Sequence, residues 1–151
     1  MNPLSNNELL GAVALQAALE SAPARQLTLP KSLLVLPLLF DKGVRSILRR
    51  QNSIILGSAD LIVSYPRAFT TMRTRYTDLL LTSLNTILLA QEMGMIAMVD
   101  DGIVLTRPLF KLDDENSIGN AASEMIQAGP KLGLILKEAD TDLYQTFRIP
   151  L

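Results

Sequence analysis

The sequence TDLLLTSLNTILLAQEMGMIAMVDDGIVLT, which spans Thr77–Thr106, decides the fold of this chain. Its first part predicts a helix over Thr77–Met93, because leucine and isoleucine recur there at helical spacing. We expect one face of this helix to build the core of the protein, and that face carries Leu80, Leu84, Ile87 and Leu88.

The second part of the stretch predicts a hairpin. Gly94 stands where helices often stop. Two β-prone runs, Met95–Val99 and Ile103–Thr106, are then joined by Asp100-Asp101-Gly102, which is typical of a tight turn. A helix, a glycine stop and a hairpin in this order form the helix-and-wing half of a winged helix-turn-helix.

Helical patterns also precede this stretch. Residues Glu8–Leu19 predict a first helix, which a linker over 21–30 follows. Lys31–Arg50 predicts one long helix that Pro37 kinks or divides. A short helix is expected over Ser58–Ser64, because serine and aspartate at its start favour an N-terminus.

The part after the hairpin is predicted to be helical as well. An acidic loop over Lys111–Asn116 leads to a helix over Ser117–Ala139, which we expect to bend near Gly129-Pro130. Asp140-Thr141-Asp142 is suited to capping a last short helix over Leu143–Phe147.

The predicted fold is therefore mostly α with a small β-hairpin, an α+β winged helix-turn-helix with flanking helices. We divide it into an N-terminal helix and linker (1–28), a winged-helix-like core (29–110) and a C-terminal helical appendage packed on that core (111–151). At 151 residues and 48% apolar composition, the chain is long and apolar enough to bury a substantial core.

The composition excludes several classes of chemistry. The chain contains neither cysteine nor histidine, which excludes disulfides, thiolate nucleophiles, imidazole bases and histidine-ligated metals. The N-terminal residues lack the basic region and cleavage site of a signal peptide. The most apolar run, Leu33–Phe40, is far shorter than the roughly 20 residues of a membrane-spanning helix. We expect a soluble cytoplasmic protein with no membrane contact.

The remaining polar motifs give no catalytic site. No phosphate-binding glycine loop is present. The two acidic clusters, Asp100-Asp101 and Asp113–Glu115, are suited to touch Mg²⁺, but a hairpin turn and a helix N-terminus explain them more simply. We therefore expect no enzyme activity, no cofactor and no resident metal.

Charge is distributed unevenly along the chain. Residues 41–75 carry seven basic and two acidic side chains, a net charge of +5, whereas residues 76–151 carry five and eleven, a net charge of −6. Such an asymmetry favours oppositely charged contact surfaces, although a solvated helix face is an equally simple reading of the basic run. The candidate residues for binding DNA or a partner protein are Lys42, Arg45, Arg49, Arg50, Arg67, Arg73 and Arg75.

Two segments carry a family resemblance. Leu29–Arg45, with the sequence LPKSLLVLPLLFDKGVR, and the ending YQTFRIP over Tyr144–Pro150 resemble the middle component of three-component ABC ATPase systems. The resemblance extends from about Leu15 to the C-terminus. Asp41–Gly43 departs from the commoner His-Lys-Pro type, and the Gly129-Pro130 pair interrupts a helix that is smoother in the family.

The resemblance implies a role in bacterial genome defence, with Lamassu-type anti-phage and anti-plasmid systems as the nearest setting. It implies a non-catalytic adaptor subunit at the heads or neck of a coiled-coil ABC ATPase similar to Rad50 and the structural-maintenance-of-chromosomes (SMC) proteins. The third component that it implies is an effector, often a nuclease. We expect the basic 42–75 region and the hairpin tip at Asp100-Asp101-Gly102 to make the partner contacts.

Two other functions compete with the adaptor. A stand-alone winged-helix transcriptional regulator would bind duplex DNA with an affinity that falls steeply with salt. Against it, the Thr77–Met93 helix offers few base-reading side chains apart from Asn85 and Gln91. An enzyme that uses the carboxylate clusters ranks third. The residues alone leave open whether the arginines face DNA or protein.

Overall fold

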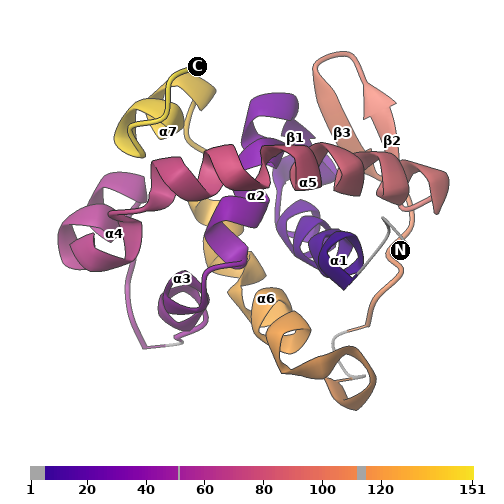
Figure 1. Ribbon diagram of the computed structural model, residues 1–151, viewed down its shortest axis with the longest axis horizontal. Helices are drawn as coiled ribbons and strands as arrows, with labels where there is room; N and C mark the ends of the chain where they lie inside the picture. The colour runs from indigo at the N-terminus through magenta and orange to yellow at the C-terminus, as the bar shows by residue number, and fades with distance from the viewer. Residues whose placement is uncertain (1–5, 51, 112–114) are drawn as a thin grey trace.

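The computed structural model describes residues 6–50, 52–111 and 115–151 (Figure 1). Its α-helices are α1 (Asn6–Glu20), α2 (Leu29–Leu39), α3 (Lys42–Leu48), α4 (Ser58–Ser64), α5 (Met72–Glu92), α6 (Glu115–Ile135) and α7 (Asp140–Thr146). Two short 3-10 helices, η1 (Pro23–Arg25) and η2 (Pro66–Phe69), join them. The strands are β1 (Gln26–Thr28), β2 (Ile96–Val99) and β3 (Gly102–Leu105).

The three strands form an antiparallel sheet in the order β1-β3-β2. The predicted hairpin is confirmed, with Val99 opposite Gly102 and Ile96 opposite Leu105. Strand β1, which lies in the predicted linker, pairs with the other edge of β3. The order α1, β1, α2, α5, β2, β3 is that of a winged-helix-like fold. Helices α3, α4 and η2 are inserted between α2 and α5.

Gly102 has a different role from the predicted one. It is the first residue of β3, and the turn consists of Asp100 and Asp101 alone. A Cβ at position 102 would lie 2.0 Å from the carbonyl oxygen of Leu27 in β1. Glycine is therefore required because the neighbouring strand approaches closely.

Helix α1 runs through the centre of the protein, where α5 and α6 pack against it (Figure 1). Small residues allow these close approaches. A Cβ at Gly11 would lie 2.5 Å from Thr86 Oγ1 in α5, and one at Gly129 would lie 2.8 Å from the carbonyl oxygen of Ala17. A single buried cluster includes residues from all three predicted segments, 1–28, 29–110 and 111–151.

The prediction of which face of α5 lies in the core is wrong in part. Ile87 is buried and Leu80 is half-buried, but Leu84 and Leu88 are exposed. The helix also buries Ser83, Thr86, Leu89 and Ala90, and Thr86 lies against Gly11 of α1, where no larger residue than glycine fits. The buried face is therefore rotated from the predicted one, and Leu81, Leu84 and Leu88 lie on the outer side.

The helix breaks also differ from the predicted ones. The long Lys31–Arg50 helix divides at Phe40-Asp41 rather than at Pro37, which is buried inside α2. Helix α6 continues through Pro130, and its non-helical residue is Gly119, with φ +85° and ψ 170°. Gly129 serves the contact with α1 rather than a bend. Part of the predicted acidic loop, residues 112–114, lies outside the described residues.

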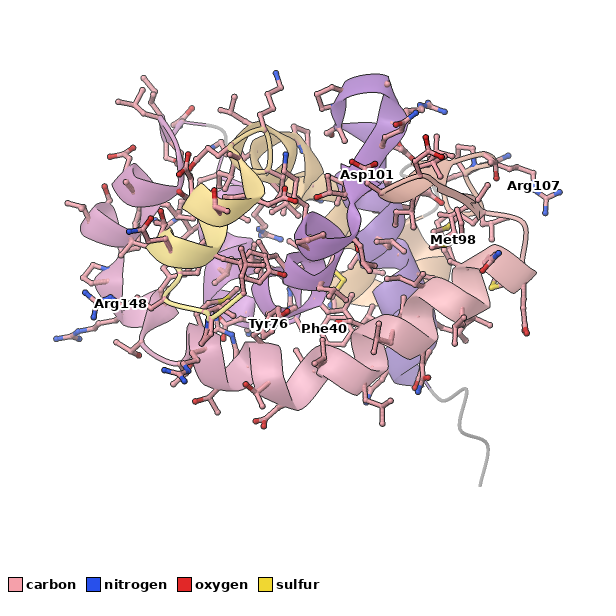
Figure 2. The ribbon with its side chains drawn as sticks, turned by 90° about the horizontal axis from the view of Figure 1, so that it is seen from above. Phe40, Tyr76, Met98, Asp101, Arg107 and Arg148 are labelled. Carbon is pink, nitrogen blue, oxygen red and sulfur yellow. The ribbon has the colours of Figure 1, made fainter. Side chains whose placement is uncertain are left out.

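Aromatic contacts attach α7 to the rest of the fold. Tyr76 points from α5 toward α7 (Figure 2), where its ring meets that of Tyr144 edge-on at 5.6 Å between centroids. The Tyr144 hydroxyl donates to the carbonyl oxygen of Pro30, and burial raises the pKa of this phenol. Phe69 stacks on Phe147 at 5.9 Å. The closing segment of the chain is therefore part of the packed structure.

Candidate partner-binding surface

The structure separates the seven predicted basic residues into two groups. Arg45 is buried and Arg75 is half-buried, and both bind main-chain carbonyl oxygens at the end of α2. The other five side chains are exposed: Lys42, Arg49, Arg50, Arg67 and Arg73.

Arg45 connects three helices. Its Nη1 donates to the carbonyl oxygens of Leu39 and Phe40, each at 3.0 Å, where α2 ends. Its Nε donates to Glu124 Oε1 of α6, also at 3.0 Å. The side chain is about one-tenth exposed, so these bonds lie largely out of water.

Arg75 reaches the same helix end from α5. Its Nε donates to the carbonyl oxygen of Pro37 at 3.0 Å, and its Nη1 donates to Thr71 Oγ1 at 2.6 Å. Burial lowers the pKa of Arg75, while the carboxylate of Asp41, 3.9 Å from Nη1, acts in the opposite direction. Asp41 also accepts from the main-chain N–H of Val44 and so caps the N-terminus of α3.

These two arginines satisfy carbonyl groups that the last turn of a helix leaves without partners. Their positive charge is also placed where the macrodipole of α2 is negative. We call Arg45 and Arg75 the inner arginines. Their contacts are internal, so they contribute little to any binding surface.

A shallow pocket of about 460 Å³ lies between α3 and η2, beside part of the exposed group. Arg50 and Arg67 both line this pocket, together with the apolar parts of Ile47, Tyr65 and Pro66. The Arg50 guanidinium lies over the Tyr65 ring, 5.7 Å from its centroid, a cation–π distance. Arg49 forms an ion pair with Glu124 at 3.3 Å but remains 40% exposed.

Exposed apolar side chains lie in the same part of the chain, and the sequence reasoning missed them. Ile54 and Leu56, in the segment that connects α3 to α4, and Val63 of α4 are each at least 80% exposed. Isolated apolar residues are common on protein surfaces, but three so fully exposed within residues 54–63, next in sequence to the pocket residues Ser64 and Tyr65, are candidates for a contact surface. We call Lys42, Arg49, Arg50, Ile54, Leu56, Val63 and Arg67 the α3–α4 surface.

The hairpin tip is also accessible. Asp100 and Asp101 are exposed, and Figure 2 shows Asp101 beside the start of α2, where its carbonyl oxygen accepts from the N–H of Leu29. Within the described residues, no group of three or more acidic side chains is arranged to hold a metal ion. Asp113 and Asp114 lie outside those residues, as does the side chain of Glu115.

None of the helices in the described part of the chain combines the length and the apolar character needed to cross a bilayer.

Comparison with known proteins gave one match. A family model described as ABC-three component (ABC-3C) system Middle Component 3 matches residues 2–151, almost the whole chain. No curated protein and no solved structure matched.

Proposed function

The chain belongs to the family of ABC-three component system Middle Component 3, and we propose that it acts in its system as a non-catalytic adaptor that holds the other components together. Its main partner in this proposal is a coiled-coil ABC ATPase of the Rad50 or SMC type. The effector, a nuclease, binds to the same assembly. The proposed setting is an anti-phage and anti-plasmid defence complex of the Lamassu type in the cytoplasm.

The observation that carries this proposal is the mixed character of the α3–α4 surface. Arg50 and Arg67 border an apolar pocket, and Val63 stands exposed on the adjacent helix. Arginine beside apolar side chains is the composition found at the centres of protein–protein interfaces. A partner segment that fits this surface combines aliphatic side chains with acidic ones.

The position of α5 favours a protein partner over DNA. In a winged helix, the helix before the wing carries the side chains that read bases. Here its outer face presents Leu81, Leu84 and Leu88, which donate no hydrogen bonds to base edges. DNA contact through the exposed arginines is retained as a second candidate, because five basic side chains on one segment suit phosphate binding.

A charge-reversal experiment tests the adaptor. The full chain is co-expressed with the ABC ATPase of its own three-component system, as wild type and as the double variant Arg50→Glu, Arg67→Glu. We expect the wild type to co-purify with the ATPase and the double variant to lose at least about tenfold in affinity, since reversal places like charges across the interface. Arg45 is left unchanged, because a carboxylate at that position would face Glu124 inside the fold.

The matched control is Arg25→Glu, an exposed arginine of η1 outside the α3–α4 surface, which should leave the complex intact. A wild-type chain that never co-purifies with the ABC ATPase of its system would contradict the adaptor proposal. Binding of the chain alone to duplex DNA, with an affinity that falls steeply between 50 and 200 mM salt, would favour the second candidate.

A further inference from the structure

The outer face of α5 carries an apolar stripe. Leu81, Leu84 and Leu88 are between 41% and 69% exposed. At 100° per residue, these three side chains fall within about 60° of one another on the helix surface. Helix α5 crosses the front of the protein in Figure 1 and lies along one edge of it in Figure 2, so this face points outward. The α3–α4 surface does not include it.

Charges of opposite sign stand at the two ends of this stripe. Arg73 is the second residue of α5 and Glu92 is its last, and the same helical spacing places both on the side of the leucines. Both side chains are exposed, and neither forms an ion pair within the described part of the chain. The face is therefore basic at one end, apolar in the middle and acidic at the other.

Such a face is complementary to itself when two copies of the helix run antiparallel. In an antiparallel pair, the numbers of two residues that lie opposite each other always add up to the same sum. A single register therefore brings together both the opposite charges and the leucines. Leu81 lies opposite Leu84 of the second copy when Arg73 lies opposite Glu92. A two-fold axis repeats each pair, so one arrangement forms two leucine contacts and two ion pairs.

We propose that α5 is a self-association surface, through which two copies of this chain pair antiparallel through Leu81 and Leu84, with Leu88 of each copy opposite Thr77 of the other. The argument for a second copy, rather than another protein, is the match between the charge order and the leucine spacing in a single register. The contact is limited to one helix face, which places it among the small interfaces of less than about 1,200 Å². We therefore expect a weak dimer in the isolated chain, which would bring two α3–α4 surfaces into one assembly.

The first test is the oligomeric state of the full chain, measured by sedimentation velocity over a wide concentration range. We expect the weight-average mass to rise toward a dimer with concentration. Leu84→Glu should raise the dimer dissociation constant by at least about tenfold, because Leu84 lies opposite Leu81 of the second copy, in the middle of the contact. Val63→Glu, which alters an equally accessible apolar residue outside α5, should leave the dissociation constant unchanged.

The second test separates a second copy from any other partner. Arg73→Glu and Glu92→Arg should each weaken the dimer by about threefold, and the double variant should restore it, because each ion pair is re-formed with reversed polarity. A chain that is monomeric at every concentration, or a dimer that Leu84→Glu does not weaken, overturns the proposal. The proposal is also overturned if the wild-type chain is monomeric and Leu84→Glu abolishes capture of the ATPase, because the leucines would then bind the ATPase and not a second copy.

The two proposals fail independently. The Arg50→Glu, Arg67→Glu variant should lose the ATPase and keep the dimer, whereas Leu84→Glu should lose the dimer and still bind the ATPase. Thermal unfolding of each variant, compared with the wild type, confirms that these exposed positions leave the fold intact.

Discussion

The inner arginines and the arginines of the α3–α4 surface come from the same basic segment of the chain and differ completely in their surroundings. Arg45 and Arg75 each bind a main-chain carbonyl oxygen at the end of α2. Arg50 lies on an aromatic ring at the border of an open pocket. The comparison shows that residue type and local charge do not distinguish an arginine that holds the fold from one that is free to bind.

The two groups of arginines differ in which hydrogen-bond acceptors their guanidinium groups can reach. A helix that ends inside a protein exposes carbonyl oxygens that must find donors. Because α2 ends at Leu39 in the middle of the fold, two guanidinium groups supply those donors. Arg50 follows the end of α3 and Arg67 lies in η2, both exposed, and neither side chain forms an ion pair in the described part of the chain, so their donors remain available to a partner.

The largest expected effect comes from removing the most buried arginine. Arg45→Ala should lower the free energy of unfolding by about 2–3 kcal/mol, because it leaves the Glu124 carboxylate and two carbonyl oxygens short of a donor. Urea unfolding measures this change. The matched control Arg50→Ala should stay within about 0.5 kcal/mol of the wild type. Equal losses at the two positions would remove the distinction between the groups.

A conservative substitution sharpens the same point. Arg45→Lys keeps the charge but replaces a planar group that donates in three directions by one that is shorter and differently shaped. We expect a loss of about 1–2 kcal/mol in the same urea measurement, between the wild type and Arg45→Ala. Full stability in Arg45→Lys would indicate that charge alone is required there.

Arg75→Ala should have an intermediate effect. The variant loses the hydrogen bond to Pro37 and the weak pairing with Asp41, and we expect a loss of about 1–1.5 kcal/mol. Arg73→Ala is the matched control, since Arg73 is exposed on the same helix. Differential scanning calorimetry should show a lower midpoint for Arg75→Ala only, and a shift of the same size in Arg73→Ala would contradict the assignment.

The smallest expected effect is that of Arg49→Ala. Arg49 shares Glu124 with Arg45, but its side chain is 40% exposed. Exposed ion pairs contribute about 0–1 kcal/mol and weaken with salt, so we expect a loss below about 0.5 kcal/mol that disappears at high salt. Chemical unfolding in urea at low and high sodium chloride checks this, and a large loss independent of salt would place Arg49 among the inner arginines.

The sequence predicted most of the helices and the hairpin, because their signals are local. The repeat of aliphatic residues identified α5, Gly94 marked its end, and Asp100-Asp101 marked the turn. Strand β1 was missed because Gln26–Thr28 is too short to carry a strand pattern and forms only by pairing with β3. The leucine face of α5 was assigned to the core because periodicity shows that two faces differ and does not show which one is covered.

The candidate site follows the same division. The sequence identified every basic residue of the α3–α4 surface, since charge is read directly from composition. It did not identify Ile54, Leu56 and Val63 as exposed, because an aliphatic residue in sequence is by default a core residue. One signal was available in the sequence for Arg45. It follows the apolar end of α2 by only five or six residues, which is close enough for its side chain to reach the carbonyl oxygens of Leu39 and Phe40.

The sequence by itself determined the helical, winged-helix-like class, the membership of the middle-component family and the absence of cysteine and histidine chemistry. These properties depend on residue type, local spacing and order along the chain. The tertiary structure alone decided which arginines are internal, which leucines face outward and why Gly102 must be glycine. Those properties depend on what a distant segment places beside a residue, such as Leu27 beside Gly102 or Glu124 beside Arg45.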